Sequence, residues 1–127
     1  MIQRAKSMVF VFGLLVLLAC QSFGKPAPLV LEGTITDTQC ALNVHSKDGS
    51  HDVMIKVGLG GANGKECTRR CVKDMGGKYV LVVKNRVYRL DNQVEPEKFA
   101  GEKVKVTATL VDAKTNTLHV VSMEVIP

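Results

Sequence analysis

The sequence contains no tryptophan, and its 127 residues include only two tyrosines and four phenylalanines. After residue 24 the aromatic side chains are Tyr79, Tyr88 and Phe99 alone. Proteins that bind nucleic acid on a sheet stack bases on exposed aromatic rings, and rings at strand positions more often belong to a core. We therefore expect no nucleic-acid partner.

Motifs of the common enzyme classes are also missing. Residues 58–65 precede a predicted helix, as a phosphate-binding loop would, but Leu59 replaces its first glycine and Glu66 replaces the Ser or Thr that holds Mg²⁺. No serine stands in a strand-turn-helix nucleophile elbow, and no third residue orients a Cys/His pair for nucleophilic attack. We expect a protein that is not an enzyme.

A long hydrophobic run occurs only at the start of the chain. Arg4 and Lys6 precede the uncharged run of residues 8–19, and small residues follow it. This order is typical of a secretory signal, and the run is too short to span a bilayer comfortably. The sequence predicts export to the periplasm or the extracellular space. The predicted segments are a signal peptide (1–24), a linker (25–28) and a single domain (29–127).

A second interpretation of the leader remains open. The residues from Leu17 to Cys20 resemble a lipobox, in which the cysteine is lipidated and becomes a membrane anchor. Leu18 stands where a small residue is usual, so ordinary cleavage near Gly24 is favoured. Membrane attachment is expected only if Cys20 is lipidated.

Neither sign of charge dominates the rest of the chain. Without Arg4 and Lys6, 15 Lys and Arg stand against 12 Asp and Glu. Such a small surplus is typical of solvated surface and indicates neither nucleic-acid nor membrane binding. No internal repeat or low-complexity tract is present, and about a hundred residues suffice for one domain with a modest core.

Alternation of apolar and polar residues predicts about five β-strands. The clearest places Val104, Val106 and Ala108 opposite Lys103 and Lys105. The two central strands flank Asn85, a residue that tolerates the positive φ of a tight hairpin. The predicted strands are 29–36, 79–84, 86–90, 103–110 and 118–126.

Helix signals are fewer. Asn63 followed by Glu66 resembles a capping box, and Gly76-Gly77 provides a stop, so a short helix is predicted over 65–75. Residues 95–100 form a predicted helical turn. Residues 37–64 lack periodicity and are interpreted as a long loop with one strand at 53–57, and loops of that length are usually functional or tied down.

The predicted fold is therefore mainly β with one or two short helices. The number and spacing of strands favour a small, closed or nearly closed five-stranded barrel of the OB type. An open α+β sheet with the helix packed across it is the alternative.

Several segments together resemble a known group of proteins. They are 33–37 with Cys40, 67–73, 77–81, 87–90 and 99–107. In these segments the chain is similar to a family of small exported bacterial proteins that contain a domain of unknown function. The resemblance covers nearly all of the chain after the leader and implies an exported OB-like domain, but no activity. Ala41 and Ala108 stand where the family often has glycine, which permits backbone conformations that alanine resists.

Either mode of leader cleavage leaves three unmodified cysteines in the domain, namely Cys40, Cys67 and Cys71. In an oxidising compartment an odd thiol tends to be paired between chains, kept reactive, or bound to a metal. A single disulfide therefore does not account for all three.

The first hypothesis for these cysteines is a metal site. Cys67 and Cys71 lie one turn apart on the predicted helix, a spacing that suits two thiolate ligands and not a relaxed disulfide. Cys40 ends the first strand, and His45 or His51 follows as a fourth ligand. The predicted ligands are Cys40, His45, Cys67 and Cys71, with His51 as the alternative imidazole. Zinc suits this set, and copper as Cu(I) would recruit Met54.

The second hypothesis is a disulfide from Cys40 to Cys67 or Cys71 that clamps the helix to the strand end, with about 3 kcal/mol of stabilisation. His45 and His51 would then be ordinary loop residues. In that case the protein is a binding module that recognises an oligosaccharide, nucleic acid or protein on the barrel face.

Overall fold

The computed structural model describes residues 24–127. Apart from Gly24, the predicted signal peptide and its lipidation site at Cys20 lie outside the described residues. Residues 25–28 are exposed and belong to no helix or strand. Between residues 24 and 127, no helix has the length and apolar character needed to cross a membrane.

The described residues form five strands, three short α-helices and one 3-10 helix. Mainly β structure is therefore confirmed, whereas the three α-helices exceed the one or two that were predicted. The elements are β1 (Leu29–Asp37), α1 (Thr38–Ala41), α2 (Asp52–Lys56), α3 (Gly64–Asp74), β2 (Tyr79–Val83), β3 (Arg86–Leu90), η1 (Glu95–Phe99), β4 (Lys103–Asp112) and β5 (Thr117–Val125).

The strands hydrogen-bond in one closed ring in the order β1-β2-β3-β5-β4. The ring closes because β1 pairs with two partners: its first half, Leu29 to Thr34, lies antiparallel to β4, and its second half, Thr34 to Asp37, lies antiparallel to β2. The contact between β3 and β5 is parallel. The open sheet considered as the alternative is therefore not the arrangement of the described strands.

An apolar core fills the inside of this ring. Val104, Val106 and Ala108 are fully buried while Lys103 and Lys105 on the other face of β4 are exposed, as the alternation predicts. The aromatic residues Tyr79 and Tyr88 belong to the core, and Phe99 packs against it, so these rings do not form an exposed stacking surface. The other buried members are Ile35, Leu81, Leu90, Ala100 and Leu118.

The predicted hairpin and helix are both present. Lys84, rather than Asn85, adopts the positive φ of the β2–β3 turn, at 53°. Asn63 caps helix α3, because its side chain accepts a hydrogen bond from the Glu66 N–H at 3.0 Å. The chain leaves the helix through Gly76 at a φ of 71°. Local capping signals therefore locate this helix correctly.

The segment predicted as a long loop contains two helices, so that interpretation was wrong. The run 53–57, predicted as a strand because of its β-branched residues, lies largely in α2. The helical turn buries Met54 in one cluster with Cys40 and Cys67. Tertiary burial here outweighs the weak intrinsic preference of valine and isoleucine for strands.

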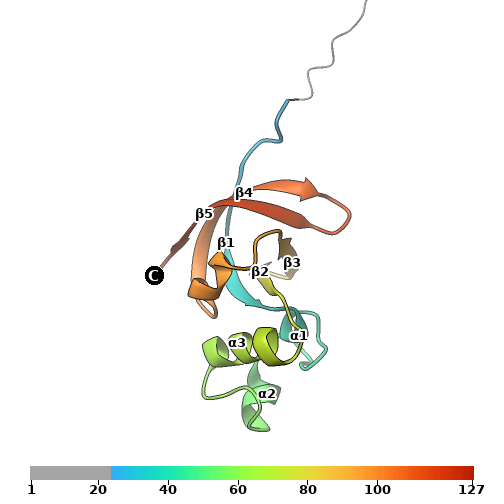
Figure 1. The fold of residues 1–127 in the computed structure, drawn as a ribbon, viewed down its shortest axis with the longest axis vertical. Helices are drawn as coiled ribbons and strands as arrows, with labels where there is room; N and C mark the ends of the chain where they lie inside the picture. The colour runs from blue at the N-terminus through green and yellow to red at the C-terminus, as the bar shows by residue number, and fades with distance from the viewer. Residues whose placement is uncertain (1–23) are drawn as a thin grey trace, which may run out of the picture.

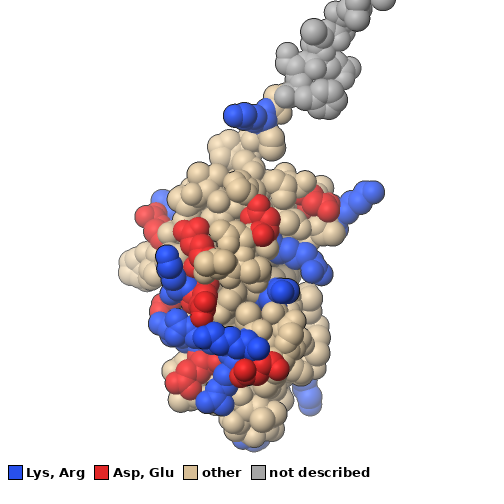
Figure 2. Space-filling model, in the orientation of Figure 1, with Lys and Arg blue, Asp and Glu red and all other residues tan. Residues whose placement is uncertain are grey.

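The helices α1, α2 and α3 gather at one end of the molecule, below the strands in Figure 1. On the face drawn in Figure 2, basic and acidic side chains lie beside each other rather than in separate fields. Ion pairs join Lys65 to Glu102 at 3.4 Å and Lys73 to Glu97 at 3.2 Å. These pairs connect α3 to the segment around η1.

Candidate metal centre

The turn from β1 into α1 fixes the position of Cys40. Asp37 ends β1 in an extended conformation and caps α1, because its Oδ1 accepts a hydrogen bond from the Cys40 N–H at 2.9 Å. The Thr38 N–H donates to the Lys78 carbonyl at 2.9 Å, which ties the same turn to the start of β2. Cys40 is thereby held at the end of the sheet with its side chain fully buried.

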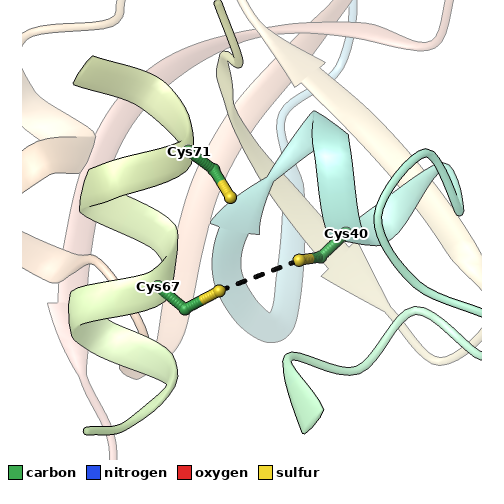
Figure 3. Close-up of side chains that lie close together, drawn as sticks. All are labelled: Cys40, Cys67 and Cys71. Carbon is green, nitrogen blue, oxygen red and sulfur yellow. Dashed lines mark hydrogen bonds between the residues drawn. The ribbon is translucent and has the colours of Figure 1, made fainter. Parts of the chain in front are cut away.

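Helix α3 supplies the other two thiols. Cys67 and Cys71 lie one turn apart on one face of the helix and point toward Cys40, as Figure 3 shows. The Cys40 and Cys67 sulfurs are 4.0 Å apart, and all three sulfurs lie within 4.8 Å of one another. None of the three side chains is exposed to solvent. The structure thus brings together the three predicted cysteine ligands.

The spacing of the sulfurs differs from that of a disulfide. All three cysteines are free, and 4.0 Å is about twice the length of a sulfur–sulfur bond. The disulfide clamp considered from the sequence is therefore not formed. Two thiolates at about 2.3 Å from a tetrahedral zinc ion would lie roughly 3.8 Å apart. The sulfur triangle is close to this size.

The structure places His51, and not His45, beside the cysteines. His51 belongs with Asp37 and Cys40 to a second group whose ligand atoms lie within 4.8 Å of one another. Its Nδ1 is 3.8 Å from Asp37 Oδ2. His45 is in neither group; its backbone N–H donates to the Gln39 carbonyl at 3.0 Å.

Two threonine hydroxyls orient the His51 ring. His51 Nε2 lies 3.1 Å from Thr36 Oγ1 and 3.4 Å from Thr68 Oγ1, whereas its Nδ1 is buried without a hydrogen-bond partner. Metal-ligating histidines commonly use one ring nitrogen for the ion and the other for such an orienting bond. The ring is thus held with its free nitrogen toward Asp37.

A buried carboxylate, that of Asp37, lies beside Cys40. Asp37 is fully buried, and its Oδ2 has no hydrogen-bond partner. Burial, together with the negative charge of Asp37, raises the pKa of Cys71 to about 12 and also raises the pKa of Cys40. Burial raises the pKa of Cys67 as well, although its sulfur neighbours partly oppose this. Without an ion the thiols stay protonated at neutral pH.

A glycine loop closes over the sulfurs. Gly60 is buried, and its N–H donates to the Met54 carbonyl at 2.8 Å. A Cβ at this position would lie 3.0 Å from Cys67 Sγ and 2.8 Å from the Ile55 backbone nitrogen. Only glycine therefore lets the loop approach the sulfur this closely. The loop shields the cluster from water.

Sequence reasoning missed Asp37, the two threonines and Gly60. An Asp three residues before Cys40 is a helix-cap signal that could have identified Asp37. The glycines between residues 58 and 64 were interpreted as turn residues, and nothing in the sequence indicates which of them touches a sulfur. Met54, proposed as a soft ligand for copper, is buried in the same cluster as the cysteines.

Comparisons with known proteins add no further constraint. No family model, no curated protein and no solved structure matches this chain. The resemblance to a family of exported bacterial proteins stays a prediction, and the interpretation of the site depends on its own geometry.

Proposed function

We propose that this protein is a small exported metal-binding domain that holds a thiophilic divalent ion, with zinc favoured, between the β1–α1 turn and α3. One observation carries the proposal. Three fully buried sulfurs from two separate elements lie within 4.8 Å of one another, beside a buried carboxylate oxygen that has no partner. Buried polar groups without partners are rare, and a bound cation accounts for this one.

Charge favours a divalent ion over Cu(I). When ionised, Cys40, Cys67, Cys71 and Asp37 together carry four negative charges in a site that water does not reach. A monovalent ion offsets one of them and a divalent ion offsets two. Buried charge without compensation costs several kcal/mol, so the site stabilises Zn²⁺ more than Cu⁺.

The ion's role follows from what its ligands connect. Cys40 belongs to α1, directly after β1, and the other two cysteines belong to α3, so the ion ties α3 to the turn by which the chain leaves the sheet. The loop at Gly60 lies against Cys67, and all three cysteines are fully buried, which slows exchange of the ion with solvent. These features favour stable holding of the ion over its delivery or a hydrolytic reaction, and they support a role other than that of an enzyme.

The finer features of the proposal have separate support. The closed strand order with its single parallel contact, between β3 and β5, supports an OB-like five-stranded barrel. The charged, apolar and small residues of the leader support export.

Elemental analysis of protein purified without reductant or chelator, combined with its intact mass, tests the proposal. We expect at least one zinc ion per chain and a mass with all thiols retained. Met54→Leu is the matched control, because it keeps the buried volume and removes only the thioether; zinc content should not change. A metal-free protein lighter by two hydrogens would contradict the proposal and favour the disulfide-clamped binding module.

A ligand-binding role for the sheet surface has a defined location but weaker support. A cavity of about 260 Å³ lies beside β2 and β3, lined by residues that include Lys78, Arg89 and Gln93. The Gln93 amide already bonds both the N–H and the carbonyl of Tyr79, at 2.7 and 3.0 Å. Tyr79 lines the cavity but is only 3% exposed, so its ring offers a base or sugar little surface for stacking.

A further inference from the structure

Among residues 24–127, the potential ligands form two groups of three rather than one group of four. One contains Cys40, Cys67 and Cys71, and the other contains Asp37, Cys40 and His51. Cys40 is the only member that the two groups share. A single ion with three thiolates and one imidazole would require His51 to approach Cys67 and Cys71 as closely as it approaches Cys40.

Two ligand atoms of the second group are unused. Asp37 Oδ2 and His51 Nδ1 are both buried without a hydrogen-bond partner, although they lie only 3.8 Å apart. This separation is too long for a hydrogen bond. Two ligands at about 2.0 to 2.2 Å from a common tetrahedral zinc ion lie roughly 3.3 to 3.6 Å apart. The separation of 3.8 Å is slightly longer than this, so a small movement of either side chain would let both atoms bind one ion.

We propose that the centre takes two divalent ions that share the Cys40 thiolate. The first ion is bound by Cys40, Cys67 and Cys71, and the second by Asp37, Cys40 and His51. This inference rests on the proposed function, because it assigns a second ion to the same cluster. In this arrangement Asp37 and His51 bind the second ion, and neither of them is a fourth ligand of the first ion.

Charge compensation supports two ions. The three thiolates and the Asp37 carboxylate carry four negative charges, of which one divalent ion leaves two without compensation. Two divalent ions offset all four. Because Asp37 and the three cysteines are fully buried, the neutral arrangement avoids the cost of uncompensated charge in a low dielectric.

The two positions differ in access to solvent. The three thiols are fully buried, whereas the His51 side chain is 17% exposed. The second ion is therefore bound by two hard or borderline ligands and a shared thiolate at the edge of the site. We expect it to bind more weakly and to exchange faster than the first ion.

Titration of the metal-free protein with Zn²⁺, followed by native mass spectrometry, counts the ions. We expect one tight and one weaker equivalent, two ions per chain in all. A single ion per chain would overturn the two-ion inference and leave the proposed function intact. No bound ion would overturn both.

Variants assign the second ion to its ligands. His51→Ala and Asp37→Asn should each reduce the count from two ions to one, and Asn at position 37 retains the oxygen that caps α1. His45→Ala is the matched control, because His45 lies in the same part of the chain but in neither ligand group; it should keep two ions. Two ions in both ligand variants, or loss of one in the control, would contradict the assignment.

Substitution with Co²⁺ tests the shared thiolate. Each equivalent should increase the thiolate charge-transfer absorption, but the second should weaken the electron paramagnetic resonance of the first, because a bridging sulfur couples the two spins. An additive signal from two independent ions would contradict a shared Cys40. In His51→Ala the signal of the first equivalent should persist without weakening.

Discussion

The ring of strands and the helical insertion (residues 38–78) bury different kinds of side chain. The main apolar core contains ten buried residues and lies within the ring, whereas the insertion's cluster contains four, of which three are cysteine. The partly buried apolar neighbours of the second cluster are only Ile55 and Met75. Two short helices and a third of eleven residues are thus organised around sulfur rather than around aliphatic side chains.

This difference indicates that the two regions are stabilised by different means. Burial of aliphatic side chains, at about 1.5 to 3 kcal/mol each, is sufficient for a small sheet. Helices shorter than about a dozen residues are marginal alone and need tertiary support. Structural zinc supplies roughly 10 to 16 kcal/mol of apparent binding free energy in small zinc modules. We therefore expect the insertion to fold without the ion but to open more readily, so that the ion adds most of its local stability, while the apolar core stabilises the strands.

The largest expected effect comes from Cys40→Ala, which removes the thiol common to both ligand groups. Zinc affinity should fall by more than about 100-fold, since loss of even an outer partner of a ligand costs about 10- to 100-fold. Competition with a chromophoric chelator measures the change. Met54→Leu is the control and should leave the zinc affinity unchanged. If Cys40→Ala kept the full zinc affinity, the claim that a metal bound through Cys40 stabilises the insertion would be wrong.

Leu81→Ala should lower the stability of the protein without changing zinc binding, in contrast to Cys40→Ala. Leu81 is fully buried in the core of the ring, and its truncation should lower the free energy of unfolding by about 2 to 5 kcal/mol. Urea denaturation measures the loss, and metal analysis should find the zinc stoichiometry unchanged. Loss of zinc together with stability would mean that the two regions do not depend on separate interactions.

The pH dependence of the metal-free protein sharpens the comparison further. Burial raises the pKa of Cys71 from 9.0 to about 12, so the unfolded chain ionises this thiol first. Stability is unaffected by this group below about pH 9 and falls above it, by about 1.4 kcal/mol per pH unit, until the folded thiol also ionises.

Thermal unfolding of the metal-free protein between pH 8 and 11 checks this dependence, with Cys71→Ala as the reference. The variant should lose less stability on the alkaline side, because other titrating groups such as Tyr79 are common to both proteins. Identical alkaline slopes would contradict the burial of this thiol in the metal-free state.

Gly60→Ala should have the smallest effect, a roughly tenfold faster release of zinc. The added Cβ would meet the Ile55 backbone at 2.8 Å and Cys67 Sγ at 3.0 Å, which lifts the loop from the sulfurs. Stopped-flow transfer of zinc to a chelator measures the rate. Gly58→Ala is the comparison, because a Cβ there meets nothing although its φ of 81° disfavours alanine; release should stay close to the normal rate.

The ring of strands was largely predictable from the sequence. Alternation along residues 103–110 identifies β4 because one face is buried and the other solvated, and the same reasoning applies to β1 and β5. Helix α3 follows from Asn63, Glu66 and the glycines after it. The gathering of the cysteines was predictable in part, since Cys67 and Cys71 share a helix face and Cys40 follows the first strand.

The insertion before α3 was not predictable in the same way. Helices α1 and α2 have four and five residues, too few for periodicity to distinguish them from a loop or a strand. The choice between His45 and His51 depends on the irregular path of the chain between α1 and α2. The pairing of His51 with Thr36 and Thr68 is a tertiary contact that no local pattern encodes.

Amide hydrogen exchange on the protein with and without zinc tests the central claim most directly. We expect removal of the ion to expose amides of residues 38–78, with protection falling by more than about 100-fold in α3, while amides of β2, β3, β4 and β5 keep their protection. Unchanged protection in the insertion after removal of all metal would contradict the account. It would mean that the buried cysteines stabilise the insertion as apolar core residues, without an ion.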